Sequence, residues 1–162
     1  MRHTRIQKAG LYLDSLANVP LFIAITCVLV FFLYYKGHEK DAELFLASAG
    51  TLMLLVGTLK ILTNKPRPKN SLVDVPWPAF PSGHAAVSAF LAISIPYFAL
   101  PKSEMLAVAL GLLGILATSV VSLNRLVIRV HTRTQVAAGI LLGTLVSSSL
   151  ILFHDQLIAL IP

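Results

Sequence analysis

Five long apolar stretches constrain this chain more than any other feature of its sequence. They cover residues 19–35, 43–63, 83–100, 103–123 and 134–153. At a rise of about 1.5 Å per residue, helices of these lengths cross, or nearly cross, a hydrocarbon core about 30 Å thick. Open strands would leave backbone polar groups unpaired in lipid, whereas a helix pairs them internally. The sequence therefore predicts an all-α integral membrane protein with five transmembrane helices.

A short amphipathic segment precedes these stretches. Within residues 3–17, apolar side chains recur at helical spacing, while Arg5, Lys8 and Asp14 lie elsewhere on the helix. This pattern is typical of a helix that lies in the membrane interface. The chain is 56% hydrophobic and 12% charged, whereas soluble domains carry about 25% charged residues. We therefore expect a single membrane domain over residues 1–162, with one interfacial helix beside the five spans.

The net charge of +6 arises from cations that flank the apolar stretches. Cations at such positions favour binding to anionic lipid head groups. A chain embedded in a bilayer offers little soluble surface along which to bind a nucleic acid, so we expect no nucleic acid partner. Cys27 is the single cysteine, and the five histidines are too scattered for a zinc site. No metal site is expected.

Three short basic and histidine clusters lie where apolar stretches end or begin. Because successive helices alternate in direction, the three clusters and the N-terminus should lie on one side of the membrane. Burying Lys, Arg and His at a bilayer edge is costly unless an anion binds there. We therefore expect a phosphate site at the membrane surface. The clusters are Lys60 with Arg67-Pro68, then Pro81-Ser82-Gly83-His84, then Arg125 with His131.

The first cluster surrounds the end of the second apolar stretch. Pro66 is expected to end the helix, so that Arg67 lies on the loop and Lys60 points up from below. Arg offers a planar fork for two phosphate oxygens, and Lys offers a compact charge. Alternatively, both side chains simply anchor the helix end at the interface. The following loop, residues 64–82, contains five prolines and Trp77, so we expect a stiff, non-helical lid.

The second cluster opens the third apolar stretch. A proline suits the first helical turn, and Ser82 can cap the helix or donate to a ligand. Free N–H groups at a helix start can bind an oxyanion, and Gly83 allows the ligand to approach closely. His84 would then lie at the mouth of the site as a general acid. The alternative is a capped helix start that carries an interfacial histidine.

In the third cluster, Arg125 and His131 are six residues apart. On a continuous helix they would lie about 240° apart, so a break is needed for both to face one ligand. Gln135, one turn after His131, can hydrogen-bond its ring and leave the other nitrogen free to attack phosphorus. A histidine at this position could otherwise be an ordinary interfacial residue.

Together the clusters resemble the motifs of the type 2 phosphatidic acid phosphatase (PAP2) superfamily of metal-independent lipid phosphatases. Those motifs read Lys, six residues, Arg-Pro; then Pro-Ser-Gly-His; then Ser-Arg, five residues, His, three residues, Asp. The same spacings run from Lys60 to Arg67-Pro68, from Pro81 to His84, and from Asn124-Arg125 to His131. The resemblance covers roughly residues 55–150 and implies a PAP2-like helical bundle.

The resemblance also implies a role for each motif residue. His131 would be the nucleophile that forms a phosphohistidine, and His84 would protonate the leaving oxygen. No metal ion or other cofactor would be needed. The phosphoryl oxygens would be held by Lys60, Arg67, Ser82, Gly83 and Arg125.

Two residues depart from the family pattern: Asn124 replaces Ser, and Gln135 replaces Asp. An Asp would orient the histidine and also stabilise its imidazolium, whereas Gln can only orient it. Gln here also resembles the polyprenyl-diphosphate branch of the family. We predict that activity is retained, with Gln135 as a catalytic-site residue and Asp74 as a conceivable compensating carboxylate. The family commonly has six spans, and the one missing here would precede the first motif.

The resulting prediction is hydrolysis of a lipid phosphate monoester or diphosphate. Candidate substrates are lipid A 1-phosphate, undecaprenyl diphosphate and phosphatidylglycerol phosphate. The alternatives are a lipid phosphotransferase with the same intermediate, and a non-catalytic carrier or anionic-lipid-binding protein. No obligate protein partner is implied. Four more cations could hold the substrate head group, or only bind anionic lipid: Lys65, Lys69, Arg129 and Arg133.

Most Lys and Arg residues fall on the predicted active side, which a positive-inside count would place in the cytoplasm. Several of those charges are required by the site itself, so the count is biased. The resemblance to bacterial enzymes instead implies a multi-pass protein of the inner membrane, with its active site facing the periplasm.

Overall fold

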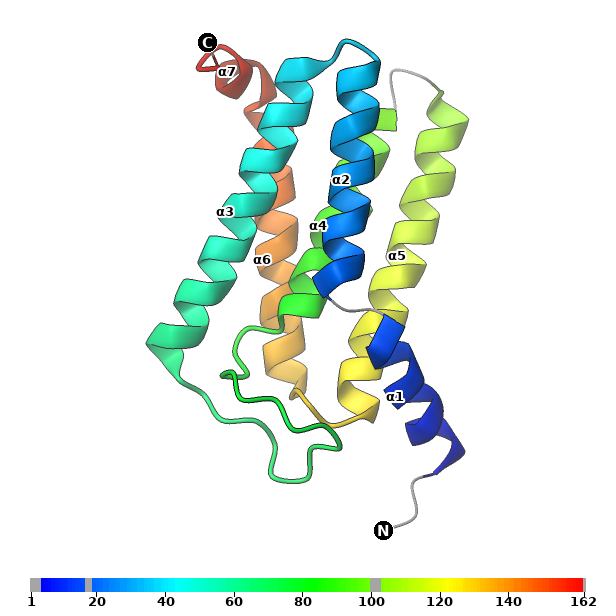
Figure 1. Cartoon of the computed structure of the whole chain (residues 1–162), viewed down its shortest axis with the longest axis vertical. Coiled ribbons are helices and arrows are strands. Elements are labelled where there is room, and N and C mark those ends of the chain that lie inside the picture. Colours follow the sequence, from blue (N-terminus) through cyan, green and yellow to red (C-terminus); the bar gives the residue numbers. More distant parts are fainter. Residues whose placement is uncertain (1–3, 17–18, 100–102, 162) are drawn as a thin grey trace.

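The computed structural model describes residues 4–16, 19–99 and 103–161, and its regular elements there are α-helices. Figure 1 shows their arrangement as an elongated bundle. In chain order the helices are α1 (Arg5–Leu16), α2 (Val19–Tyr35), α3 (Glu39–Thr63), α4 (Gly83–Ala99), α5 (Glu104–Val127), α6 (Arg133–Leu152) and α7 (His154–Ile158). The predicted all-α fold is confirmed.

Five of these helices are apolar, but they differ in length. Three, α3, α5 and α6, have the length and composition needed to cross a membrane. The other two, α2 and α4, are apolar but only 17 residues long. The protein is therefore a multi-pass membrane protein in which long and short apolar helices pack together.

Several helix ends differ from the predicted ones. α3 begins at Glu39 rather than residue 43. The negative charges of Glu39 and Asp41 in its first turn stabilise the helix there, because the N-terminal end of a helix dipole is positive. α5 continues to Val127 rather than ending at residue 123, and α6 begins at Arg133 after a Thr132 cap. The short helix α7 was not predicted. Residues 3, 17 and 100, at which predicted segments began or ended, lie outside the described residues.

Helix α4 lies at the centre of the bundle and packs most closely against α5 and α6. The contact with α6 depends on Gly139 and Gly143. A Cβ at either position would collide with the backbone of Ser82 or Ala86 on the α4 side. These two glycines therefore permit a close helix approach, as small residues do at helix contacts in membranes. At Gly57, by contrast, nothing lies within 4 Å of an added Cβ.

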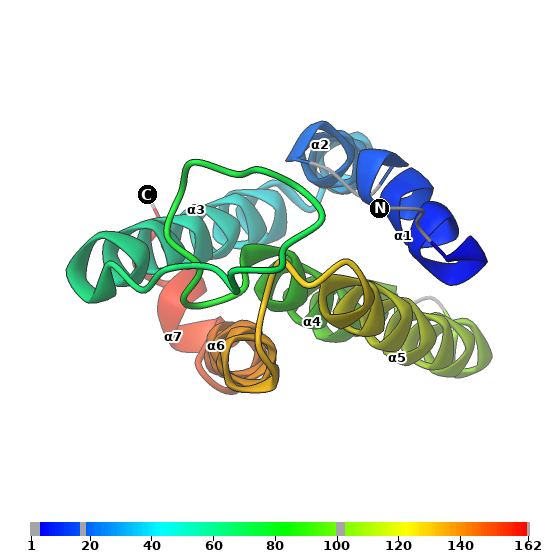
Figure 2. The same ribbon diagram turned by 90° about the horizontal axis from the view of Figure 1, so that it is seen from below.

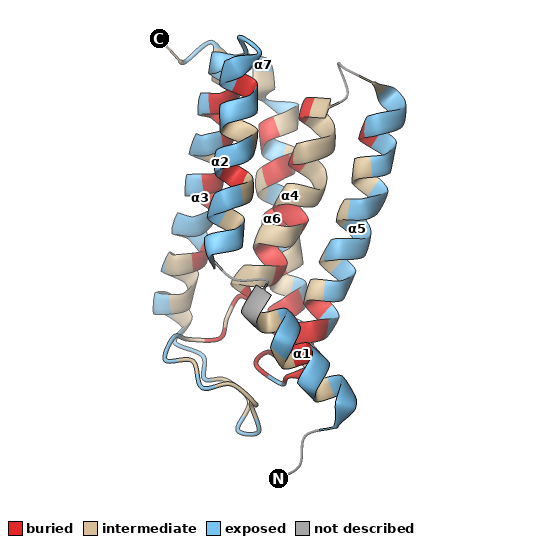
Figure 3. Cartoon of the chain, turned by 45° about the vertical axis from the view of Figure 1, so that its right-hand side comes forward, coloured by how far each residue is buried: buried red, intermediate tan, exposed pale blue. Residues whose placement is uncertain are grey.

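The buried core is formed mainly between α3, α4 and α6. Phe45 packs against Phe90 and Phe98, with ring centroids 5.5 and 5.9 Å apart. Figure 3 shows that the outward surfaces of α2, α3 and α5 are mostly exposed. Apolar side chains such as Leu112 and Leu116 lie there, 65% and 60% exposed, as expected for helices that face lipid.

The connections place all three clusters at one end of the bundle. The loop of residues 64–82 and the short α5–α6 connection both lie at this end, beside α1 (Figure 1). The C-terminal helix α7 lies at the opposite end. The predicted placement of the three clusters on one side is therefore confirmed, whereas the first three residues of the chain lie outside the described residues.

Candidate active site

Backbone hydrogen bonds join the three clusters. The Leu72 N–H on the long loop donates to the Ile128 carbonyl at 3.0 Å, and the Ser82 N–H donates to the Gln135 carbonyl, also at 3.0 Å. Seen from below, the long loop passes close to the α5–α6 connection (Figure 2). Segments that are far apart in sequence are thus held together as one surface.

The α5–α6 connection turns the chain so that His131 points back into the bundle. Arg129 has a left-handed backbone with a φ of 59°, and the Arg125 carbonyl accepts the N–H groups of both Val130 and His131. The His131 side chain is 6% exposed. The break that the spacing of Arg125 and His131 requires is therefore present.

The ring of His131 lies in a cationic environment. Its Nε2 is 3.4 Å from Arg67 Nη1, and its Nδ1 is buried without a hydrogen-bond partner in the described part of the chain. Burial, followed by the charges of Arg67 and Lys60, lowers the pKa of His131 to about 3. At neutral pH the imidazole is therefore uncharged, and because Arg67 is a donor, Nε2 carries the lone pair.

Lys60 and Arg67 hold the long loop in place. Lys60 Nζ donates to the Pro78 carbonyl at 2.7 Å, and Arg67 donates from Nε to Trp77 O at 3.2 Å and from Nη1 to Val130 O at 3.0 Å. Burial, followed by repulsion from Arg125, lowers the pKa of Arg67. Helix α3 ends at Thr63, so Lys60 lies on the helix and Arg67 on the loop, as expected.

The second cluster forms the start of α4. Ser82 is fully buried, and its Oγ has no partner among the described residues, although its carbonyl accepts the N–H of Ala86. Gly83 is the first residue of the helix, and His84 follows it. The buried hydroxyl therefore lies at a helix N-terminus with its hydrogen bond unmade, in a position where an anion could accept it.

Arg125 occupies the last turn of α5 and is 3% exposed. Its Nη1 forms an ion pair with Asp14 of α1, while its Nε and Nη2 are buried without a partner in the described chain. Asp14 had no predicted role. The one feature of the sequence that sets it apart is that Asp14 is the single acidic residue of a helix that carries Arg5 and Lys8.

Gln135 is buried, and its side chain caps the start of α6. Its Oε1 accepts the Thr132 N–H at 2.9 Å, and its own N–H donates to Thr132 Oγ1 at 3.4 Å, which together make a capping box for α6. Gln135 lies close enough to His131 to oppose the fall in its pKa, but Oε1 is engaged with Thr132. Asp74, the other residue considered, is exposed on the long loop.

The four additional cations lie on the surface around these clusters. Lys65 stacks over the Phe80 ring, with Nζ 5.0 Å from the ring centroid. Lys65 and Lys69 also line a cavity of about 820 Å³ that the long loop surrounds. All four side chains are exposed, namely those of Lys65, Lys69, Arg129 and Arg133.

A second cavity, of about 580 Å³, begins at the clusters and continues between the helices. One end is polar. The remaining lining is almost entirely apolar and comes from α2, α3, α4, α5 and two residues of the long loop, Val75 and Trp77. The polar end is formed by Lys60, Arg67, Gly83, His84 and His131. The other three motif residues, Ser82, Arg125 and Gln135, are buried and are not on this lining.

Chemically, the site offers a neutral imidazole, a second histidine, several cations and unused hydrogen-bond donors. Four of the eight buried side-chain atoms that lack a partner in the described chain belong to motif residues: Ser82 Oγ, Arg125 Nε and Nη2, and His131 Nδ1. These donors are available to hydrogen-bond a polar ligand. Within the described residues, no group of three or more His, Cys, Asp or Glu side chains could hold a metal ion.

Comparisons with known proteins agree with this geometry. A sequence model described as the PAP2 superfamily matches residues 41–158. The fold is similar to the crystal structure of the first transmembrane PAP2-type phosphatidylglycerolphosphate phosphatase from Bacillus subtilis, with a TM-score of 0.84 at 23% identity. The match covers 96% of this chain and 80% of that chain. A comparison with curated proteins gives no match.

Proposed function

The chain belongs to the PAP2 superfamily, and on this premise we propose that it hydrolyses a lipid phosphate monoester or diphosphate through a phosphohistidine. The observation that carries the proposal is the state of His131. It is a buried, uncharged imidazole that faces Arg67 in a cavity lined also by Lys60 and His84. Cations around an uncharged nucleophile favour the approach of a phosphate anion.

In the proposed first step, the Nε2 lone pair of His131 attacks phosphorus, and the P–O bond to the lipid breaks. His84 gives its proton to the leaving oxygen. In the second step, water attacks the phosphohistidine and gives a proton to His84. Inorganic phosphate leaves, and His131 regains its lone pair.

The phosphoryl oxygens are proposed to bind the cations and the start of α4. Ser82 Oγ and two Arg125 nitrogens have no partner in the described chain, so these donors are available. Lys60 and Arg67 donate hydrogen bonds to carbonyl groups of the long loop. When the substrate binds, some of these donors would hydrogen-bond the phosphate instead. Fixed donors of this kind supply charge stabilisation without rearrangement during the reaction. Gln135 is proposed to support the site by capping α6 directly after His131.

The shape of the cavity supports a lipid rather than a soluble phosphate as substrate. Its lining residues on α4 recur along one helical stripe from His84 to Ile95. Eleven residues of helix span about 16 Å, close to half of a hydrocarbon core about 30 Å thick. The groove therefore has the length of one leaflet, which favours an acyl lipid, and phosphatidylglycerol phosphate is the first candidate to test.

Two related functions use the same site. If a second lipid rather than water attacks the phosphohistidine, the protein is a phosphotransferase, and phosphate appears on that lipid. We further propose that the active site faces the periplasm and that the surface cations, such as Lys65 and Arg129, contact anionic head groups. A non-catalytic lipid carrier would not need His131.

Release of inorganic phosphate tests the proposed activity. Purified protein in detergent micelles with phosphatidylglycerol phosphate should release phosphate, and His131→Ala should reduce the rate by roughly 10⁴-fold or more. Equal release by the two proteins would exclude the proposed enzyme. Label found on an added acceptor lipid instead of in free phosphate would identify the transferase.

The groove is tested by two neighbouring leucines of α5. Both side chains are largely exposed, at 61% for Leu113 and 65% for Leu112, but Leu113 lines the cavity and Leu112 does not. Leu113→Trp should raise KM for a long-chain lipid several-fold and leave a short-chain analogue unchanged, because only the long chain occupies the blocked groove. Leu112→Trp is the matched control and should leave both values unchanged. An equal effect of both variants on both substrates would contradict the assignment.

A further inference from the structure

We propose that Asp14 of α1 is a positioning residue: it holds one nitrogen of Arg125 so that the opposite edge of the guanidinium binds the phosphoryl group. This inference rests on the proposed function, because it assigns Arg125 to the substrate phosphate. It adds to the site a residue that lies outside all three motifs and comes from the helix at the start of the chain.

The ion pair with Asp14 compensates the buried positive charge of Arg125. Arg125 is 3% exposed, and its Nη1 contacts Asp14 Oδ1. A buried guanidinium requires a hydrogen-bonded counter-charge, since removing one partner of such a pair leaves an isolated buried charge. In the described chain, Asp14 is the acidic side chain that forms an ion pair with Arg125.

The unused part of the guanidinium has the geometry of a phosphate site. Nε and Nη2 lie along one edge of the planar group, and both are buried without a partner in the described chain. Two parallel N–H groups on one edge bind two oxygens of one phosphate. Because Asp14 takes Nη1, the orientation of the guanidinium is fixed while the bidentate edge stays available.

The contact between α1 and α5 is built for close approach. Gly10 lies one turn before Asp14 and therefore on the same face of α1. A Cβ at Gly10 would lie 2.8 Å from both Asn124 Oδ1 and Ile128 Cγ2. A methyl group at Gly10 would displace these two side chains or move α1 away from the end of α5, so glycine favours the close approach in which Asp14 reaches Arg125. Figure 1 shows α1 beside the lower end of α5.

The start of α1 is also fixed. The Thr4 N–H donates to Gln7 Oε1 at 3.0 Å, and the Gln7 N–H donates to Thr4 Oγ1 at 3.2 Å, so the two residues form reciprocal capping bonds. Asp14 also acts beyond Arg125. Burial and Arg125 lower the pKa of Arg67, and Asp14 partly opposes this effect. The carboxylate therefore belongs to the electrostatic environment of the site.

The test compares kinetics of the full chain in detergent micelles with phosphatidylglycerol phosphate, together with inhibition by orthovanadate as a phosphate analogue. Asp14→Asn should lower kcat/KM and weaken vanadate inhibition, each by ten- to a hundredfold at most, as expected for a misplaced binding group (about 10²). Asp14→Glu should recover most of both values. Glu104→Gln, which removes an exposed acid at the opposite end of α5, is the matched control and should change neither.

A second pair of variants tests the contact without changing any charge. Gly10→Ala should move α1 and reproduce the kinetic loss of Asp14→Asn, whereas Gly57→Ala has open space for its methyl group and should match the wild type. This pair also covers the case in which Asp14→Asn fails to fold. Because vanadate affinity is measured on folded, active protein, lower stability alone would not change it.

Three results would overturn the inference: kinetics of Asp14→Asn equal to those of Glu104→Gln, tighter vanadate binding by Asp14→Asn, or kinetics of Gly10→Ala equal to those of the wild type. Tighter binding would mean that Asp14 competes with phosphate for Arg125. If the wild type itself releases no phosphate, the proposed function fails instead, so the two failures are distinguishable.

Discussion

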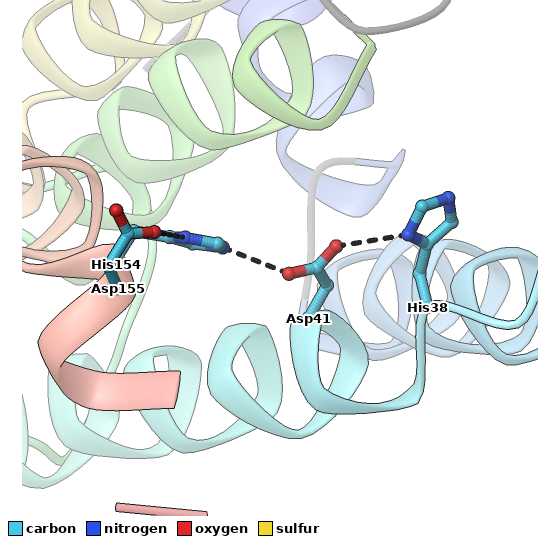
Figure 4. A network of polar contacts seen from close by, with 4 residues as sticks. All are labelled: His38, Asp41, His154 and Asp155. Atoms are coloured by element: carbon cyan, nitrogen blue, oxygen red, sulfur yellow. Dashed lines mark hydrogen bonds and ion pairs between the residues drawn. The ribbon is translucent and has the colours of Figure 1, made fainter. Parts of the chain in front are cut away.

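His131 and His154 lie at opposite ends of one bundle and in opposite electrostatic surroundings. His131 is surrounded by Arg67 and Lys60, and burial together with these charges lowers its pKa to about 3. His154 lies between two carboxylates, with Nε2 2.9 Å from Asp41 Oδ1 and Nδ1 3.1 Å from Asp155 Oδ1 (Figure 4). Burial lowers the pKa of His154, but these hydrogen bonds outweigh burial and raise it overall.

The difference separates a binding site from a structural contact. At the end of the bundle that contains His154, both ring nitrogens of this histidine have carboxylate partners, and Asp41 also contacts His38 at 3.4 Å. This network joins α7 to the start of α3. At the end of His131, the Ser82 hydroxyl and two nitrogens of Arg125 are buried without a partner in the described chain, which is a cost in stability that an anion bound there would remove. Unmade interactions therefore mark the functional end.

The largest expected contrast is in activity, between histidines of the two ends. His84→Ala should reduce phosphate release by about 10² to 10⁴-fold, as expected for a general acid. His154→Ala should remain within about twofold of the wild type, because it changes only the contact with α3 and α7. Phosphate release from phosphatidylglycerol phosphate measures both. A large loss in His154→Ala would remove the distinction between the two ends.

The second contrast is between the pKa values of His131 and His154, and Arg67→Met tests its cause. NMR of labelled histidines should show wild-type His131 uncharged down to about pH 3 and His154 titrating above its ordinary value of 6.5. In Arg67→Met, the pKa of His131 should rise, but not fully to 6.5, because burial is the larger cause. As the pH is lowered, the activity of Arg67→Met should therefore fall at a higher pH than that of the wild type, because its His131 becomes protonated earlier. A wild-type His131 that titrates near 6.5 would contradict this account.

The smallest expected contrast is in stability. A raised pKa of His154 means that the protonated pair with Asp41 stabilises the fold below pH 6.5, and that this contribution is lost as pH rises through the folded-state value. Asp41→Asn should therefore cost about 1 kcal/mol at pH 5.5 and less at pH 9.

Thermal unfolding in detergent at the two pH values measures this difference. Asp155→Asn is the control, because Asp155 is 98% exposed whereas Asp41 is 21% exposed. Its effect should be smaller at both pH values. A cost of Asp41→Asn that does not change with pH would show that the pair with His154 is not responsible.

The sequence was sufficient to predict the all-α membrane fold and the gathering of the three clusters at one end. Apolar length predicts the helices, and alternation of helix direction places the clusters. The ends of α3 and α5 were less predictable, because Glu39 and Arg125 are polar residues at the borders of apolar stretches. At such borders, capping and tertiary contacts decide where a helix stops.

The environment of Arg125 could not be predicted, because it depends on a contact between the first helix and the fifth. Nothing local at Asp14 or Gly10 indicates which helix they meet. Gln135 was predictable in part. Thr132 and Gln135 have the spacing of a capping box, and this local pattern competes with the expected hydrogen bond to His131. The structure places the Gln135 side-chain oxygen on Thr132.

The proposed mechanism requires that His131 becomes covalently phosphorylated. The most direct measurement is rapid quenching of the wild type and His131→Ala after mixing with phosphatidylglycerol phosphate labelled with ³²P in the terminal phosphate, followed by mapping of the labelled peptide. We expect an acid-labile, base-stable label on His131 in the wild type and no label in His131→Ala. Phosphate release without a label on His131, or an equal label in both proteins, would contradict it.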